Sequence, residues 1–203
     1  RPSVVHSHFK PISKSAAIHQ RITTSPDTNA SCTPNPLRWN PFDEPTSKTD
    51  FINGITTLVT NGNAQLQLGI AVHLYHANQS MNRRYFYNSD GELLVVPQQG
   101  EIKFHTECGV IAAFPGEIVV IPRGLKFRVE LIDKHASGYI CENYGAAFEL
   151  PERGPIGANG LANSRDFYYP HAHFEDIDEE GELVCKYSGQ LFHTNIDHSP
   201  LNI

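Results

Sequence analysis

Large apolar residues alternate with small or polar ones in the stretch 67–76, QLGIAVHLYH. A period of two places successive side chains on opposite faces of an extended chain, so this stretch predicts a β-strand with one buried face. Its large apolar residues are Leu68, Ile70, Val72 and Leu74, and the residues between and after them are Gly69, Ala71, His73 and Tyr75.

Further short apolar runs follow at regular spacing. Glycines 91, 100, 109, 116 and 124 punctuate them at intervals of 9, 9, 7 and 8 residues. Regular short strands with turns between them, and no long 3.6-residue period, predict an all-β sandwich or barrel with little helix. The expected strands are 85–87, 93–96, 102–105, 110–114, 118–121, 127–131 and 139–143, with a weaker strand signal at 183–187.

Proline and glycine divide the chain into two parts. Half of the 14 prolines lie in the first 45 residues, whereas the first of the 15 glycines is Gly54. The stretch 11–36 is rich in Ser, Thr and Pro without a sustained period, which favours an extended connector. The stretch 37–51 holds the single tryptophan, so we expect it to pack as an irregular arm. We therefore expect a Pro-rich extended arm at 1–53 and a β domain at 54–203.

Composition narrows the class of protein. The chain has 203 residues, a formal net charge of −6, 39% hydrophobic and 19% charged residues, which suits one packed domain and disfavours nucleic-acid binding. Its apolar runs are far shorter than the roughly 18 to 20 residues that span a bilayer. Residues 1–30 hold no apolar stretch long enough for a signal peptide. We expect no membrane association and a cytoplasmic location.

Four cysteines are scattered along the chain. Their spacing gives neither a C-x-x-C pair nor a zinc ligand set. We expect Cys32, Cys108, Cys141 and Cys185 to be reduced and mostly buried, with two disulfides as the alternative that an even count permits.

One motif indicates a specific β architecture, the jelly roll. The stretch from Gly116 to Phe127 has the spacing G-x5-P-x-G-x2, which matches the second half-motif of the cupin jelly roll. Pro122 would end a strand ladder, and Gly124 would allow the tight turn into the next strand. In metal-binding cupins the next position is a histidine ligand, and here it is Phe127. The sequence thus predicts a cupin-like jelly-roll barrel without that ligand.

The first cupin half-motif would supply two histidines and a carboxylate near residues 83–92, RRYFYNSDGE. No histidine occurs between His76 and His105. Aromatic residues stand where ligands are expected, and they would fill a barrel that is packed shut. These residues are Tyr85, Phe86 and Tyr87, so we expect no metal ligand in this barrel.

The other histidines have weaker cases as ligands. We expect His73 to face solvent or to be satisfied in the core, and His105 to lie at a hairpin tip. The pair His171 and His173, with Glu175, superficially meets the two-histidine, one-carboxylate requirement for Fe(II), but the acidic run that follows favours a solvated loop. The remaining candidates, His76 at a strand end and the His6-x-His8 pair in the Pro-rich start, are weaker still.

Nucleotide and hydrolase motifs are missing from the sequence. It contains no G-x-S-x-G, P-loop, G-x-G-x-x-G or H-E-x-x-H motif. The glycines of GPIGANGLAN, residues 154–163, lack the strand-loop-helix context of a phosphate site. We expect Arg83, Arg84 and Arg123 to be solvated or ion-paired on the surface. The sequence therefore nominates no catalytic, cofactor-binding or metal-binding residue.

Several segments together resemble the homogentisate 1,2-dioxygenase family. They are PSVVHSHFKP at 2–11, LRWNPF at 37–42, FYNSDGELLVVPQQG at 86–100, GYICENYGAAFELPERGPIGANGLANSRDF at 138–167, and KYSGQLF at 186–192. The resemblance implies an N-terminal cupin-like domain of an enzyme that opens the ring of homogentisate with O2 and Fe(II), giving 4-maleylacetoacetate in tyrosine and phenylalanine catabolism.

The resemblance also implies where the chemistry lies. The family's iron ligands and acid/base histidine would belong to a later catalytic domain, so this segment alone would bind no cofactor and would act as scaffold and oligomer interface in a hexamer of two trimers. Since the single methionine is Met81 and the chain begins at Arg1, we expect a piece of a longer protein or a processed form. The loop from Gly154 to Phe167, with Asn159, Asn163 and Arg165, would either touch another domain or subunit or form a surface loop with internal hydrogen bonds.

Two other functions compete with this interpretation. One is a metal-free cupin that acts as a binding or interaction module without catalysis. The other is a self-sufficient oxygenase that uses His171, His173 and Glu175, which would require iron in this segment. A downstream barrel with a cluster of histidines and a glutamate would favour the dioxygenase.

Overall fold

The computed structural model describes residues 5–12, 40–154 and 161–201. The connector at 11–36 lies outside the described residues except for Pro11 and Ile12, as do the single tryptophan, Cys32 and Asn159. The described residues contain no helix that is long and apolar enough to cross a membrane.

The described residues form strands and one short 3-10 helix, η2, at Ser164–Asp166. The strands are β1 (Lys10–Pro11), β2 (Ile55–Asn63), β3 (Leu68–Ala77), β4 (Arg84–Asn88), β5 (Glu92–Gln99), β6 (Ile102–Thr106), β7 (Gly109–Ala113), β8 (Val119–Ile121), β9 (Phe127–Leu131), β10 (Ala136–Asn143), β11 (Gly181–Tyr187) and β12 (Gln190–Ile196).

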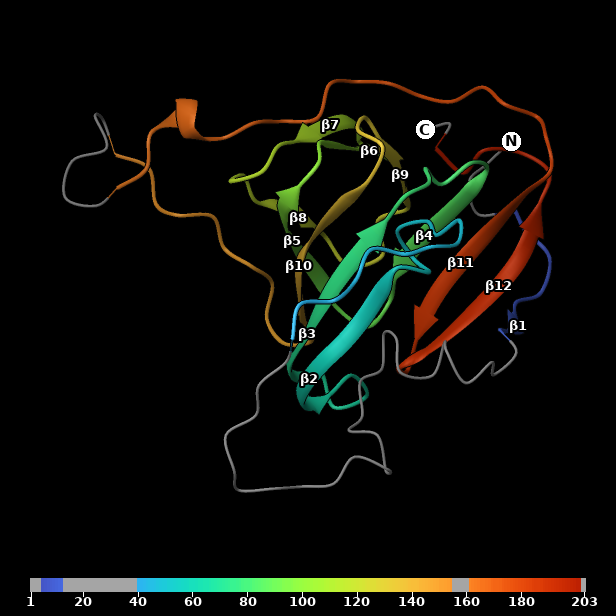
Figure 1. The fold of residues 1–203 in the computed structure, drawn as a ribbon, viewed down its shortest axis with the longest axis horizontal. Helices are drawn as coiled ribbons and strands as arrows, with labels where there is room; N and C mark the ends of the chain where they lie inside the picture. Colours follow the sequence, from blue (N-terminus) through green and yellow to red (C-terminus); the bar gives the residue numbers. More distant parts are fainter. Residues whose placement is uncertain (1–4, 13–39, 155–160, 202–203) are drawn as a thin grey trace.

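Two sheets make up the domain (Figure 1). Their strand orders are β1-β12-β11-β4-β9-β6-β7 and β2-β3-β10-β5-β8, here called sheet A and sheet B. The eight consecutive strands from β3 to β10 occur in the orders 1-8-3-6 and 2-7-4-5, which is the arrangement of a jelly roll. The predicted all-β, cupin-like architecture with little helix is confirmed.

A hairpin extends the jelly roll at one edge. β11 and β12 are antiparallel to each other, and β11 pairs with β4 in parallel, as the red strands beside β4 show in Figure 1. The short β1 then adds to β12 through Lys10 and His193. In the register of β11 with β4, Lys186 pairs with Asn88. The hairpin therefore brings a residue from the last part of the chain into the barrel, beside β4.

Aromatic rings fill the space between the sheets. Phe51, Phe86, Phe104 and Phe127 are fully or almost fully buried, and neighbouring ring centroids lie 5.6 to 6.3 Å apart. Phe86 and Phe127 are also paired across β4 and β9. Edge-to-face ring packing of this kind stabilises a core beyond the burial of its area. Phe51 comes from the 37–51 stretch, so this stretch delivers a ring to the main core.

The expected strands from 85 to 143, and the strand at 183–187, all occur with small differences at their ends. Three strands were not predicted from the sequence: the two-residue β1, β2 and β12. β2 reads ITTLVTNGN, and its threonines, asparagines and glycine obscure the alternation, because it is an edge strand in which only Ile55 is buried. β12 was missed because its sequence, QLFHTNI, alternates poorly.

The apolar series of β3 does not face the core. Ala71, His73, Tyr75 and Ala77 are buried between the sheets, whereas Leu68 and Ile70 are exposed. The outward series is the more hydrophobic one, so hydrophobicity alone indicated the wrong side of this strand. The inward face of β3 instead carries the buried His73, because the neighbouring strands β2 and β10 provide polar partners for it, Thr57 and Glu142.

Candidate functional site

A network of buried polar side chains lies between the two sheets at one end of the jelly roll. Its centre is Glu142, the inward residue near the end of β10, which is completely buried together with Lys186 of β11. His73 of β3 and Asn88 of β4 are at most 3% exposed. Each sits at an inward position of its strand, so the two-residue period of four strands brings the network together.

Glu142 accepts hydrogen bonds on both carboxylate oxygens. Lys186 Nζ lies 2.5 Å and Asn88 Nδ2 2.6 Å from Glu142 Oε1. His73 Nε2 lies 3.0 Å and the Tyr144 hydroxyl 3.1 Å from Oε2. On its other side, His73 Nδ1 lies 3.0 Å from the Thr57 hydroxyl of β2. The carboxylate is thus fully satisfied, as a buried charge must be.

Asp90 ties the network to the β11–β12 turn. Its carboxylate lies 3.1 Å from Lys186 Nζ and accepts backbone N–H bonds from Ser188 and Gly189 at 2.6 and 2.8 Å. Lys186 Nζ also lies 5.1 Å from the centre of the Tyr144 ring. One ammonium therefore contacts two carboxylates and an aromatic face, which compensates its removal from water.

The charges in this network shift the pKa of Glu142. Burial by itself raises the pKa, but the Lys186 ammonium and the hydrogen bond from His73 outweigh it and hold the pKa at about 2. The Tyr144 hydroxyl has a raised pKa, because it is buried and lies next to the Glu142 charge. Glu142 is therefore an ionised carboxylate with a cation beside it, and it stays ionised near neutral pH.

The positions of cupin metal ligands hold aromatic side chains. Phe127 and Phe86 point into the barrel and are at most 1% exposed, as expected. The expectation was wrong for Tyr85 and Tyr87, which point to the opposite face of sheet A and pack near Leu183 and Phe9. Among the described residues, no three His, Cys, Asp or Glu side chains are placed to hold one metal ion. The described residues therefore do not fit an iron ion in this barrel, and the family resemblance itself assigns the iron ligands to a later domain.

The structure separates the candidate ligands His171, His173 and Glu175. Both histidines are exposed, whereas Glu175 is 5% exposed. Glu175 accepts hydrogen bonds from Arg128 Nε at 2.7 Å, Ser199 Oγ at 2.8 Å and the Tyr85 hydroxyl at 3.1 Å. These donors lower the pKa of Glu175 against the effect of its burial. Glu175 thus fastens the segment after the 161–170 loop to sheet A.

The remaining histidines lie in separate places. His105 was expected at a hairpin tip, but it lies within β6, where it pairs with Val110 and Arg128, is 9% exposed and contacts Glu130 at 2.6 Å. Burial lowers the pKa of His105, and the bond with Glu130 opposes this. His76 lies at the end of β3 beside Phe42, and His6 and His8 are exposed.

Part of the Gly154 to Phe167 loop forms a capped turn. Asn163 Oδ1 accepts a hydrogen bond from Arg165 N, and Asp166 Oδ2 accepts one from Asn163 N at 2.7 Å. This reciprocal pattern is a capping box around η2. The Arg165 side chain is 82% exposed. Asn159 lies outside the described residues.

The arginines singled out in the sequence are engaged in contacts. Arg84 contacts Asp50 at 2.6 Å and Glu182 at 2.7 Å, and Arg83 pairs with Glu179. Arg123 Nη2 donates to the carbonyl oxygen of Tyr144 at 2.9 Å. Three cysteines within the described part have free thiols; Cys185 is buried and Cys141 half-buried as expected, but Cys108 is exposed because it sits at the hairpin tip.

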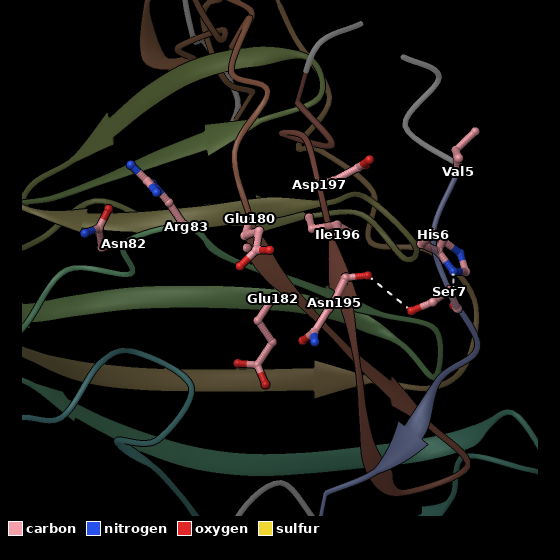
Figure 2. A pocket seen from close by; sticks show the side chains of 11 residues that line it. Val5, His6, Ser7, Asn82, Arg83, Glu180, Glu182, Asn195, Ile196 and Asp197 are labelled. Carbon is pink, nitrogen blue, oxygen red and sulfur yellow. Dashed lines mark hydrogen bonds between the residues drawn. The ribbon is translucent and has the colours of Figure 1, made fainter.

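An open surface pocket of about 760 Å³ lies beside the β11–β12 hairpin. Figure 2 shows Arg83 on one side of it, Glu180 and Glu182 in the middle, and Asn195, Ser7 and His6 on the other side. The Ser7 hydroxyl donates to the carbonyl oxygen of Asn195 at 3.2 Å. The pocket brings polar groups of both ends of the chain together at the surface, outside the barrel.

The two central residues of the buried network, Glu142 and Lys186, were not predicted from the sequence as functional or structural centres. A signal was present: Glu142 interrupts the inward series Ala136, Gly138 and Ile140 of β10, and a lone carboxylate on an inward face demands a partner. That partner could not be named, because 44 residues separate it from Glu142.

Solved structures with a similar fold cover about half of this chain. A protein titled as a putative mannose-6-phosphate isomerase from Ralstonia eutropha is 19% identical, with a TM-score of 0.43, over 55% of this chain and 100% of that one. An RmlC-like cupin family protein from Methanocaldococcus jannaschii is 13% identical, with a TM-score of 0.39, over 54% and 93%. A cupin-2 domain containing protein from Shewanella frigidimarina is 14% identical, with a TM-score of 0.38, over 50% and 84%.

A family model gives a match to the whole chain. It is described as homogentisate 1,2-dioxygenase N-terminal and matches residues 1–203.

Proposed function

Because the chain belongs to the homogentisate 1,2-dioxygenase N-terminal family, we propose that it is the scaffold part of an enzyme that opens the aromatic ring of homogentisate with O2, giving 4-maleylacetoacetate. The match of the family model over the whole chain carries this proposal. The parent enzyme would use Fe(II), which would bring the phenolate substrate and O2 together. Homogentisate and O2 would be its substrates in tyrosine and phenylalanine catabolism.

We place the iron outside this chain. One support is the aromatic pair Phe86 and Phe127, which fills the barrel where ligands would stand. The other is Lys186, whose ammonium already supplies the positive charge beside the buried carboxylate of Glu142. The residues of this chain would hold the shape of the domain and contribute subunit contacts in a trimer or hexamer. A rigid support keeps a distant site in its productive geometry.

The cytoplasm is the compartment that we propose for the parent enzyme. The three free thiols in the described part of the chain are in keeping with a reducing environment.

Oxygen uptake tests the proposal. The 203-residue chain and a polypeptide that continues it through the family's catalytic domain are each loaded with Fe(II) under anaerobic conditions, then given homogentisate and air. We expect ring cleavage by the longer polypeptide, and no O2 uptake above a free-iron control by the chain alone. Iron content is measured after dialysis in parallel.

Two outcomes would contradict the proposal. A longer polypeptide that is folded and iron-loaded but inactive would favour the metal-free interaction module. About one equivalent of iron retained by the chain alone, and lost in a His171→Ala, His173→Ala double variant, would favour the self-sufficient oxygenase.

A further inference from the structure

Residues 171–175, here called the crossing segment, run over the outer face of sheet A and start beside β7 (Figure 1). The backbone attaches this segment at both ends. At one end His171 and Val110 exchange two hydrogen bonds of 2.8 Å. At the other end Glu175 N donates to the carbonyl oxygen of Leu201 at 3.0 Å. Between these two attachments, side chains alone hold the segment to the sheet.

His105 of β6 lies beneath the crossing segment. It alternates with Phe104 and Thr106, which point into the barrel, so its side chain is on the outer face of sheet A. It is nevertheless buried, and His173 contributes to its cover, with the two ring centroids 6.1 Å apart in an edge-on arrangement. Because the segment covers a titratable ring, the attachment of the segment and the protonation of His105 are linked.

The partners of His105 define which ring nitrogen carries the proton. Nε2 lies 2.6 Å from Glu130 Oε2, and the pKa of Glu130 is lowered chiefly by this bond, so Nε2 donates to an ionised carboxylate. Nδ1 lies 3.2 Å from Arg128 Nη2, which can only donate, so Nδ1 accepts and the ring is neutral. Burial, followed by the Arg128 charge, lowers the pKa of His105 against the opposing effect of Glu130 and Glu175.

Arg128 joins His105 to the crossing segment. Its Nε and Nη2 lie 2.7 and 2.6 Å from Glu175 Oε1, and Nη2 is shared with His105 Nδ1. A proton on Nδ1 would remove that acceptor and place a second cation against the guanidinium. Glu175 Oε1 is 3.9 Å from Nδ1, and Arg128 already occupies it. Protonated His105 would therefore compete with Arg128 for the carboxylate that fastens the segment.

The charges that surround His105 come from three elements. They are Lys103 of β6 itself, Arg128 and Glu130 of β9, and Glu175 of the crossing segment, which also brings the titratable His173; the Tyr85 hydroxyl of β4 donates to Glu175. The two cations and the two carboxylates balance while His105 is neutral, so its protonation adds an uncompensated positive charge. None of these side chains belongs to a metal-ligand group within the described residues.

We propose that His105 is a proton-sensitive clamp, whose neutral ring holds the crossing segment on sheet A and whose protonation in mild acid releases it. In the released state the ring would meet water and would titrate near pH 6.5, the ordinary value for histidine, to within about one unit. The pKa of His105 is lower than this in the attached state, so acid favours release. The clamp holds fully above roughly pH 7 and weakens as the pH falls below 6.5. Release would also free the preceding loop, which contains Arg165.

Hydrogen exchange of the 203-residue chain between about pH 7.5 and 5 tests the clamp. Mass spectrometry of peptides that cover 171–175 gives the protection factor, the intrinsic exchange rate at each pH divided by the measured rate. We expect this protection to fall about fivefold or more with acid in the wild-type chain. It should change less than about twofold in His105→Gln, whose amide can donate to Glu130 and accept from Arg128 but does not titrate.

His193→Gln is the matched control. His193 also pairs with a glutamate on sheet A, Glu182 at 2.8 Å, but it lies on β12, with three strands between it and β6. The crossing segment should keep its wild-type pH dependence in this variant.

A wild-type protection factor that does not depend on pH would overturn the proposal. So would equal losses in the wild-type chain and His105→Gln, because another group would then release the segment. NMR titration of the wild-type chain gives a second test that needs no variant. The ring of His105 and the amides of 171–175 should titrate with one shared midpoint, below the ordinary histidine value of roughly 6.5, and separate midpoints would refute the clamp.

Discussion

Lys186 of β11 and Glu142 of β10 belong to different sheets, and their charged atoms lie 2.5 Å apart with both side chains completely buried. This pair joins the appended hairpin to the jelly roll. A buried ion pair is strongly coupled to its surroundings because neither charge can return to water without opening the fold.

Removal of the cation should destabilise the fold severely. We expect Lys186→Met to lower the free energy of unfolding by about 3 to 5 kcal/mol, because it leaves Glu142 charged and buried without its partner. Adding Glu142→Gln should recover part of this loss. Arg83→Met is the control: its pair with Glu179 is half-exposed, and we expect a change below about 1 kcal/mol. Urea unfolding measures all four proteins, and equal effects of Lys186→Met and Arg83→Met would contradict the role of burial.

The stability of the chain should fall in acid. The pKa of Glu142 is lower in the folded protein than its ordinary value of 4.5, so its ionised form stabilises the fold above about pH 5, and this contribution disappears as the pH drops toward 2. Its size is on the order of 3 kcal/mol at 1.36 kcal/mol per pKa unit. Glu175 contributes in the same direction because its pKa is also lowered. Urea midpoints between pH 2 and 7 should flatten in Glu142→Gln, and an unchanged acid slope would refute the assignment.

Gly124 should be needed for its backbone conformation. Its φ is +82°, and a Cβ there would meet nothing within 4 Å, so the cost of a side chain is strain rather than a clash. We expect Gly124→Val to cost about 1 to 3 kcal/mol. Gly145→Val is the control, since Gly145 has ordinary contacts and no positive φ in this range. Thermal melts in which both variants behave alike would speak against the turn.

A single histidine in the barrel should not create a metal site. Phe127→His removes a ring that packs against Phe51, Phe86 and Phe104, and it supplies one ligand where at least three are needed. We expect a loss of about 3 kcal/mol or more, as for large core truncations. Metal analysis after dialysis should show no stoichiometric Fe(II), Zn(II) or Mn(II) for Phe127→His or the parent chain. Phe127→Leu, which stays apolar, should lose less stability.

Arg165 should matter only in the assembled enzyme. Its side chain is 82% exposed and its nearest carboxylate, Asp166, is 4.0 Å away, so Arg165→Ala should change the stability of the chain by less than about 0.5 kcal/mol. In the parent enzyme we expect it to lower hexamer content and activity together. A folded, iron-loaded Arg165→Ala hexamer without activity would instead place this loop at the active site.

Much of the architecture follows from local pattern. The turn glycines and short apolar runs predicted most of the strands between 85 and 143, and the spacing from Gly116 to Phe127 predicted the jelly roll and assigned Phe127 to the usual ligand position. These features are readable because a strand and its turn are determined within about ten residues, by the two-residue period and by the φ angles that glycine alone adopts readily.

The tertiary structure decided which face of each strand is buried. On β3 the sequence pattern favoured Leu68 and Ile70, yet His73 and Tyr75 are inside. His73 is tolerated there because Glu142, 69 residues later, offers its carboxylate. Glu142 in turn depends on Lys186, which only the parallel pairing of β11 with β4 brings into the barrel. The sequence contains all three residues, but burying a charge is favourable only once its partners have been assembled, and that assembly is a property of the fold.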